Sequence, residues 1–320
     1  MDAELIVFTG NANRPLAEKI CDWLDMPLGE ALVGQFSDGE TRVELNSNVR
    51  GRDVFIIQST SCPTNHHLME ALIMADACHR ASAARVTFVA PYFGYARQER
   101  KSAPRTPISA KLVADLIQAA HFNRMLTVEL HTSAIQGFFN IPVDHLYAKP
   151  VFASHFQRGE NLVVVSPDAG GVERARAMAK HFNCGLAIVD KRRDKPNESA
   201  VMNVIGDVRG KNCLVIDDIV DTAGSLTKAA DALIEVGALS VRAAISHAVL
   251  SGNALENLRN SKIEELVVTD SIMLSPEAQA CSKITQLSLA ELLGKAIRRI
   301  HNDDSISACL YNTLIWIIKK

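Results

Sequence analysis

The sequence of 320 residues predicts an α/β fold in which a mainly parallel sheet is built twice along the chain. Short apolar runs rich in β-branched residues alternate with helical patterns, and this cadence occurs once in each half. The length also suffices for two domains of roughly 150 residues, each able to bury a sizeable core. A boundary is expected near residues 147–150, because Pro142 and Pro150 bracket an irregular stretch before the second series of strands.

The alternation of apolar runs with helical patterns predicts the strands and helices in order along the chain. In the first half the sequence predicts strands at residues 5–8, 54–58, 86–90 and 125–129, with helices at 16–24, 67–81 and 109–120. In the second half it predicts strands at 162–166, 186–190, 201–205, 214–217, 241–246 and 266–269, with helices at 173–182 and 226–236.

Composition narrows the classes of partner. The net charge is −2 and 22% of residues are charged, which indicates neither a nucleic-acid-binding arm nor a disordered acidic tail. Small molecules and other copies of the chain are the expected partners. The seven cysteines form no Cys-x-x-Cys motif, which favours reduced thiols and a cytoplasmic location. No signal peptide is recognisable, and no apolar stretch approaches the ~20 residues of a membrane span.

The most informative segment is 213–226, an apolar strand that ends in Asp217 and Asp218 and leads through a turn of small residues into a helix. Open parallel sheets place ligands at the carboxyl ends of their strands, where these carboxylates can accept hydrogen bonds from vicinal hydroxyls. Backbone N–H groups from Asp221 to Ser225 can face a phosphate at the start of the helix. The segment predicts a socket for a phosphorylated sugar, although an acidic turn that only caps a helix is the alternative.

Two other polar segments follow predicted strands in the first half. The string Phe36-Ser-Asp-Gly-Glu40 reads as a polar turn that joins two strands. Residues 91–107 lack periodicity and contain Arg97, Arg100, Lys101 and Arg105, which suits a mobile lid over an anionic ligand. A solvated basic loop is the alternative for this segment.

Two further side chains and one charged string lie at or just past the ends of predicted strands. His131 and Asp168 would suit Mg²⁺ bound to nucleotide phosphates if they meet across the domain junction, although each also has an ordinary structural explanation. The string Asp190-Lys-Arg-Arg193 ends a buried strand with three cations. Its position favours neutralisation of charge in a transition state over a merely solvated cluster.

These strings, in this order, resemble the class I ribose-phosphate pyrophosphokinases, from Gly10-Asn-Ala to Ser305-Ile-Ser307. The phosphoribosyltransferases share only the loop at 217–225. The resemblance implies two phosphoribosyltransferase-like domains, at 1–147 with the ATP site and lid and at 148–303 with the ribose 5-phosphate site, followed by a tail at 304–320. It also implies a homohexamer that transfers the β,γ-diphosphoryl group of ATP to the 1-hydroxyl of ribose 5-phosphate. The products would be 5-phosphoribosyl 1-pyrophosphate and AMP.

The resemblance assigns a role to each matching residue. Lys191 and Arg193 are implied as the catalytic pair, with Arg193 also near the sugar phosphate, and His131 and Asp168 as ligands of the required Mg²⁺. The implied ATP site comprises Phe36, Asp38, Gly39, Glu40, Arg97, Gln98 and Arg100. The implied ribose 5-phosphate site comprises Asp217, Asp218, Asp221, Thr222, Ala223, Gly224 and Ser225. Activation by inorganic phosphate is implied at Arg50, Arg52, Ser82, Ser305 and Ser307.

The chain departs from the family pattern in two places. Glu129 stands where the family often has Asp, and residues 132–134 differ beside His131, which bears on metal binding. An apolar tail at 310–320 is expected to pack on the first domain or on a neighbouring subunit. A phosphoribosyltransferase and a regulatory homologue without activity are the rival functions. The retained Arg97, Lys191 and Arg193 favour an active synthetase over both.

Overall fold

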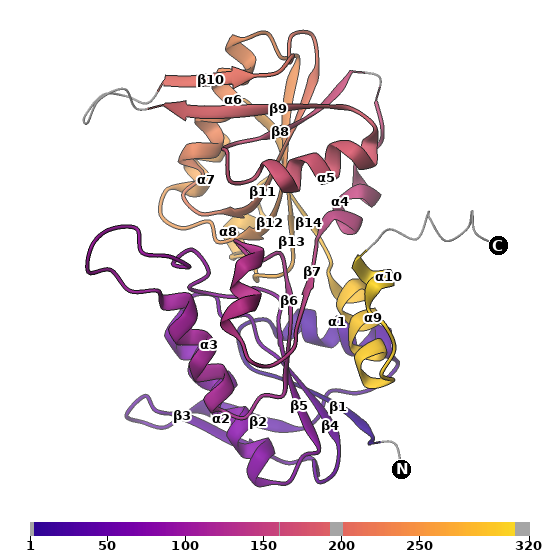
Figure 1. Ribbon diagram of the computed structural model, residues 1–320. Coiled ribbons are helices and arrows are strands. Elements are labelled where there is room, and N and C mark those ends of the chain that lie inside the picture. The colour runs from indigo at the N-terminus through magenta and orange to yellow at the C-terminus, as the bar shows by residue number, and fades with distance from the viewer. Residues whose placement is uncertain (1–2, 160, 193–200, 311–320) are drawn as a thin grey trace, which may run out of the picture. The chain divides into compact units, whose positions relative to one another are not determined.

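The computed structural model describes residues 3–159, 161–192 and 201–310 (Figure 1). The described residues form two compact units. The first takes in residues 3–147, 271–273 and 288–310, and the second takes in residues 148–270 and 274–287, within the described ranges. The chain therefore leaves the first unit at Tyr147 and returns to it near its C-terminal end.

The first unit is built on a five-stranded parallel sheet of order β1-β4-β5-β6-β7. Its strands are β1 (Leu5–Thr9), β4 (Asp53–Ile57), β5 (Arg85–Ala90), β6 (Arg124–Val128) and β7 (Val143–Leu146). Its first helices are α1 (Arg14–Leu24), α2 (Thr64–Arg80) and α3 (Ser109–Ala119), and a 3₁₀ helix, η1, spans Ser133–Phe138. These elements confirm the four predicted strands and three predicted helices. Strand β7 was missed, because its four residues lie in the stretch between two prolines.

A separate antiparallel hairpin joins β2 (Ala31–Gln35) to β3 (Thr41–Leu45). Residues 36–40 form its turn, as the sequence predicted. The hairpin packs on α2 and leaves the Phe36 side chain 51% exposed. Its strands escaped prediction because each is only half-buried and lacks a continuous apolar run.

The second unit contains a seven-stranded sheet of order β10-β9-β8-β11-β12-β13-β14, in which only the pairing of β10 with β9 is antiparallel. Its strands are β8 (Leu162–Ser166), β9 (Gly185–Arg192), β10 (Val201–Ile205), β11 (Asn212–Val220), β12 (Ser240–Ala248), β13 (Ile263–Thr269) and β14 (Ile284–Leu287). Its helices are α4 (Lys149–His155), α5 (Val172–Phe182), α6 (Gly224–Glu235), α7 (Ala254–Arg259) and α8 (Pro276–Gln279). The six predicted strands and two predicted helices are confirmed.

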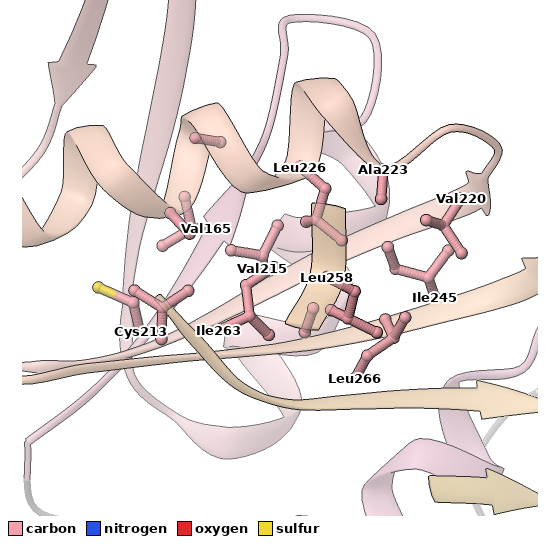
Figure 2. Close-up of a cluster of buried hydrophobic side chains, with 14 of the residues drawn as sticks. Val165, Cys213, Val215, Val220, Ala223, Leu226, Ile245, Leu258, Ile263 and Leu266 are labelled. Atoms are coloured by element: carbon pink, nitrogen blue, oxygen red, sulfur yellow. The ribbon is translucent and has the colours of Figure 1, made fainter. Parts of the chain in front are cut away.

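The core of the second unit fixes the start of α6 against the sheet. Figure 2 shows Val215 and Val220 of β11 beside Leu226 of α6 and Leu258 of α7. Cys213 and Val215, two positions apart on β11, point to this face, as expected for a pleated sheet. Because Ala223 is also buried in this cluster, apolar contacts anchor the turn between β11 and α6 to the core.

The last long helix, α9 (Ala290–His301), belongs to the first unit. The sequence had assigned residues up to 303 to the second domain, but α9 packs on α1. At Gly294 a Cβ atom would lie 2.4 Å from the ring of Trp23, so glycine permits the close approach of the two helices. Arg298 lies over the same ring at 4.6 Å and donates to the Leu24 carbonyl. The short helix α10 (Ser307–Leu310) follows.

A buried ion network also ties α9 to the amino ends of the strands. The Asp53 carboxylate is fully buried and accepts two hydrogen bonds from Arg85, at 3.1 and 2.6 Å. His301 contacts the same carboxylate at 2.9 Å, and Arg85 also reaches Asp303 at 3.0 Å. The hydrogen bond with Asp53 raises the pKa of the Arg85 guanidinium. The buried charge is therefore fully paired, as burial requires.

All seven cysteines are free. Burial raises the pKa of the Cys21 and Cys78 thiols to about 12, so both stay protonated near neutral pH. Within the described ranges, no helix combines the length and the apolar character needed to cross a bilayer.

Candidate active site

The acidic pair lies at the carboxyl-terminal part of β11, which runs beside β12 as far as Val220. Asp218 is buried and Asp217 is partly buried, and the Asp218 amide donates to Asp217 Oδ1 at 2.9 Å. Arg174 of α5 lies between the two carboxylates, with Nη1 at 3.4 Å from Asp217 Oδ1 and 3.3 Å from Asp218 Oδ1. The sequence did not single out Arg174, because nothing in a run of helical residues shows which side chain reaches a neighbouring strand.

The surroundings of Asp217 favour its protonated form over its charged form. Burial raises the pKa of this carboxyl well above its ordinary range, and the negative charge of Asp218 raises it further. Arg174 partly offsets both effects. Perturbed carboxyl pairs of this kind are concentrated at functional sites, although ion networks in structural roles also produce them.

The turn after β11 is anchored by Ser251, in the loop after β12, and by Asn257 of α7. Ser251 donates to the Asp221 carboxylate through its hydroxyl and to the Asp221 carbonyl through its amide, the latter at 3.0 Å. Asn257 Nδ2 donates to the Thr222 carbonyl at 2.9 Å. The Thr222 and Ser225 side chains remain exposed. A ligand can therefore reach the two hydroxyls while the backbone beneath them stays anchored.

Ala223 precedes the first residue of α6 with a φ of 60°, in the left-handed region. No side chain caps the helix, so its first N–H groups are not satisfied by a capping residue. Such a helix start, beginning here at Gly224, favours an anion through both its free donors and its dipole. The structure thus confirms the predicted order of strand, turn and helix, and binding of a phosphate there stays a prediction.

Asp168 lies just past β8, in a tight glycine turn. Its Oδ1 accepts from the Gly171 amide at 2.9 Å, and its side chain is exposed. A Cβ atom at Gly171 would lie 2.9 Å from Ser166 Oγ, so a side chain here would force Ser166 to shift. The turn fixes Asp168 at the carboxyl-terminal edge of the second sheet.

His131 follows β6 on the first unit and is exposed. The turn before it is constrained: Glu129 is buried with a φ of 46°, and the Leu130 amide donates to His145 Nε2 at 2.9 Å. His131 and Asp168 belong to different units, so their joint binding of a metal stays a prediction. Within the described ranges, no group of three or more His, Cys, Asp or Glu side chains gathers to hold a metal ion.

The predicted nucleotide residues lie on two exposed loops of the first unit. In the hairpin turn, the Phe36 amide donates to the Glu40 carbonyl at 2.8 Å and the Glu40 amide donates to Asp38 Oδ1 at 3.1 Å. Gly39 has a φ of 93°, a backbone conformation that glycine adopts without strain. Asp38, Gly39 and Glu40 are exposed.

The second loop leads from β5 to α3 and exposes Arg97, Gln98 and Arg100. Gln98 is bonded to the start of α3, since Ser109 donates to its side chain and the Ala110 amide donates to its carbonyl. Gln98 therefore anchors one end of the loop to the helix. Arg97 and Arg100 extend on the exposed side, as the predicted lid requires.

The predicted catalytic cations lie partly outside the described residues. Lys191 is at the end of β9, where it pairs with Met202 of β10, and its side chain is not described. Arg193 lies outside the described residues, and so does the apolar tail from residue 311 onward.

The predicted regulatory residues fall into two groups on the first unit. The Gly51 amide, between Arg50 and Arg52, donates to the Ser82 carbonyl at 2.8 Å. Ser305 and Ser307 are joined through their hydroxyls at 3.0 Å, and Ser305 lines a cavity of about 310 Å³ with Arg124, Asp144 and Asp304. Arg52 pairs with Glu4 at 3.0 Å. Binding of phosphate at these residues remains a prediction.

Comparison with known sequences covers almost the whole chain. The N-terminal domain of ribose phosphate pyrophosphokinase matches residues 5–120, and the phosphoribosyl synthetase-associated domain matches residues 189–311. The ribose-phosphate pyrophosphokinase of Rhizobium meliloti (strain 1021) is 58% identical over 305 residues, which cover 94% of this chain and 98% of the relative. The chain belongs to the ribose-phosphate pyrophosphokinase family. The resemblance inferred from the motifs is thereby confirmed.

Two further relatives of this family are equally complete matches. The ribose-phosphate pyrophosphokinase of Marinomonas sp. (strain MWYL1) is 56% identical over 310 residues, 96% of this chain and 98% of the relative. The crystal structure of phosphoribosylpyrophosphate synthetase from Mycobacterium smegmatis matches with a TM-score of 0.88 at 38% identity, over 94% of this chain and 99% of that structure. Membership of the family favours a diphosphokinase over a phosphoribosyltransferase.

Proposed function

We propose that the protein transfers the β,γ-diphosphoryl group of ATP to the 1-hydroxyl of ribose 5-phosphate, giving 5-phosphoribosyl 1-pyrophosphate and AMP. One observation carries the proposal beyond family membership. The acidic pair Asp217 and Asp218, bridged by Arg174, leads directly through an anchored turn into the free N-terminus of α6. This order of groups suits vicinal hydroxyls followed by a phosphate at one sheet edge.

Each part of the sugar phosphate has a matching group. Asp217 and Asp218 accept hydrogen bonds from the ribose hydroxyls, and the residues from Asp221 to Ser225 surround the 5-phosphate. The exposed hydroxyls of Thr222 and Ser225 add donors to the helix N-terminus. Phe36, Asp38, Gly39 and Glu40 border the adenosine of ATP, and Arg97, Gln98 and Arg100 complete the nucleotide site.

The reaction forms one bond and breaks one. The 1-hydroxyl oxygen attacks the β-phosphorus of ATP, the bond from that phosphorus to the α–β bridging oxygen breaks, and AMP departs with both bonding electrons. The hydroxyl proton is released to solvent or to a nearby carboxylate. Charge spreads over the phosphoryl oxygens in such a transition state, so cations and positioning supply most of the catalysis. Lys191, Arg193 and the lid arginines are the cations that the chain provides.

Mg²⁺ fits the donors at hand. It binds through one or two carboxylates, keeps several waters and takes its remaining ligands from substrate phosphates, so a cage of three protein ligands is not required. Asp168 offers an exposed carboxylate and His131 an imidazole, which would hold the ion beside the nucleotide. The bound ion supplies neutralisation of phosphate charge.

The product of the reaction tests the proposal. The protein is incubated with ATP, Mg²⁺ and ribose 5-phosphate, and the nucleotide product is separated by ion-exchange chromatography. We expect AMP in equal amount to 5-phosphoribosyl 1-pyrophosphate. Formation of ADP with ribose 1,5-bisphosphate would mean attack on the γ-phosphorus and would refute the assignment, as would the absence of turnover.

The remaining proposals concern assembly and location. A class I enzyme of this family is a homohexamer in the cytoplasm and is activated by inorganic phosphate, and the segments around Arg50, Ser82 and Ser305 match that regulatory site. Measurement of mass in solution tests the assembly, and measurement of activity across a phosphate titration tests the activation. A monomer, or a rate independent of phosphate, would contradict them.

A further inference from the structure

A carboxylate in the middle of α2 is completely buried. The Glu70 side chain has no exposed surface and accepts four contacts. Asn11 Nδ2 lies at 2.5 Å and His66 Nε2 at 3.1 Å from Oε1, while Gln58 Nε2 lies at 2.5 Å and the Asn11 amide at 3.1 Å from Oε2. A buried carboxylate is costly unless its oxygens are paired, so this cluster holds its members in place strongly.

The cluster gathers at the carboxyl-terminal edge of the first sheet. Asn11 follows β1, and Gln58 follows β4, where its Oε1 also accepts from the Ala12 amide at 3.0 Å. Gly10 leaves no room for a side chain, because a Cβ atom there would lie 2.5 Å from Gln58. Glu70 thus fixes the edge at which parallel sheets bind ligands.

Two arms lead from Glu70 to the hairpin strand β2. Asn11 Nδ2, which donates one hydrogen to Glu70, donates to the Val33 carbonyl at 3.1 Å. His66, which contacts Glu70 through Nε2, meets Gln35 Nε2 through Nδ1 at 3.2 Å. A neutral imidazole with its hydrogen on Nε2 satisfies both contacts, because it donates to Glu70 and accepts from the Gln35 amide.

Both arms end close to Phe36. Gln35 is the last residue of β2 and directly precedes Phe36. Val33 lies two residues before Gln35 on the same strand. The hairpin is a separate two-stranded sheet, and an isolated hairpin is marginally stable in water. Packing on α2, apolar contacts of Val33 and Val43 with the core, and these polar arms hold it in place.

We infer that Glu70 is a positioning residue for ATP, acting through His66 and Gln35 and through Asn11 on the turn at residues 36–40. The inference rests on the proposed function, in which that turn borders adenosine. In this role the buried Glu70 carboxylate sets the affinity for ATP without touching the nucleotide. If Glu70 were purely structural, it would stabilise the unit, but substitutions in the arms would not alter ATP binding.

The sharpest variants cut the His66 arm at its exposed end, Gln35, or at His66 itself. Gln35→Ala and His66→Ala leave the Glu70 cluster with its Asn11 and Gln58 donors. Each is expected to raise KM for ATP about 2- to 10-fold, the range for one lost hydrogen bond, with kcat and KM for ribose 5-phosphate unchanged. Because both changes break one arm, the double variant should raise KM little further than either single variant.

Asp76→Asn is the matched control, since Asp76 lies on the same helix in an exposed pair with Arg80 at 2.7 Å. It should leave all three kinetic constants unchanged. If Gln35→Ala and His66→Ala also leave KM for ATP unchanged, or if they alter both substrates equally, the inference is overturned.

Hydrogen exchange decides the inference independently of activity. In Glu70→Gln, and more weakly in His66→Ala, amides of residues 31–45 should exchange faster than in the parent protein, whereas those of β5 and β6 should not. Unchanged exchange in residues 31–45 would overturn the positioning role. If the parent protein formed no AMP, the proposed function would fail, while this exchange pattern would still report on the arms.

Discussion

At the scale of single residues, the acidic pair on β11 combines a proposed role in sugar binding with a cost in stability. The neighbouring charge of Asp218 disfavours ionisation of the partly buried Asp217, and Arg174 contacts both carboxylates. Carboxylates that bind sugar hydroxyls must remain close to each other even without substrate. The unliganded protein therefore carries repulsion that a ligand relieves.

We predict that Asp217→Asn makes the protein more stable at pH 7. The amide keeps the Oδ1 acceptor for the Asp218 amide and removes one charge from the pair. The gain should be about 1 kcal/mol, a size typical of relieved active-site strain. It is measured by urea denaturation, and binding of ribose 5-phosphate should weaken at the same time.

The gain should depend on pH in a definite direction. Because the folded-state pKa of Asp217 is raised, its stability contribution is full below about pH 4 and is lost as pH rises through the folded value. The difference between variant and parent should thus grow from pH 4 toward pH 7. Asp207→Asn is the control, since Lys211 lowers the pKa of Asp207. An equal difference at both pH values would contradict the prediction.

Lys191 is the second residue with a defined expectation. We predict that Lys191→Ala lowers kcat by at least ~100-fold with little change in KM, the result expected when a donor to the transition state is lost. Lys211→Ala, which breaks an exposed pair with Asp207 at 2.9 Å, serves as the control. Near-normal kcat in Lys191→Ala would identify the 190–193 cluster as a solvated group.

The sequence located candidate site residues where each lies next to the end of a buried strand, and the structure confirms their positions, while their roles stay predictions. Asp168, Asp217 and the turn at 221–225 were found in this way, because an apolar run marks the strand and the polar residue after it marks the edge. Arg174 and Glu70 could not be found, since their roles depend on contacts from helices to other elements. Long-range pairs of this kind leave no local pattern in a single sequence.

At the scale of elements, the contact between α1 and α9 depends on one residue without a side chain. We predict that Gly294→Ala destabilises the protein by about 1–3 kcal/mol, although alanine ordinarily favours a helix. The added Cβ would lie 2.4 Å from the Trp23 ring, which Arg298 also covers. The free energy of unfolding measures the loss.

Gly137→Ala provides the matched control for this prediction. Gly137 lies in η1, and a Cβ atom there would meet no other atom within 4 Å. Its replacement should leave stability nearly unchanged. If Gly294→Ala were as stable as Gly137→Ala, the packing of α9 on Trp23 would not limit the approach of the helices.

Elements were predictable to the extent that their patterns are uniform. The fully buried strands β4 and β8 read directly as apolar runs. By contrast, β2, β3 and β7 are short and half-buried, and they form only because α2 or a neighbouring strand covers them. The amphipathic character of α9 is visible in its sequence, but nothing local shows which unit it covers.

At the scale of the whole molecule, the first unit is completed by the end of the chain. We predict that a chain ending at residue 287 unfolds in its first unit, whereas a chain ending at residue 310 keeps it. Without α9, Trp23 loses Gly294 and Arg298, and the Asp53 carboxylate loses His301. Removing one partner from a buried charge typically costs several kcal/mol.

Tryptophan fluorescence is the measurement. The sequence contains two tryptophans, Trp23 and Trp316, and both shortened chains lack the second. Emission therefore reports on Trp23 alone, and we expect a shift to longer wavelength only in the chain ending at 287. Identical spectra and melting temperatures would contradict a structural role for α9.

The return of α9 also sets an order of events on the ribosome. Asp53 and His301 are 248 residues apart, so at 5–20 residues per second the buried carboxylate emerges roughly 10–50 s before its imidazole partner. During that interval residues 148–270 and 274–287 have all been synthesised, and the second unit can fold. The unit encoded first is therefore the one finished last, and a chain that ends before residue 290 lacks the helix that covers Trp23.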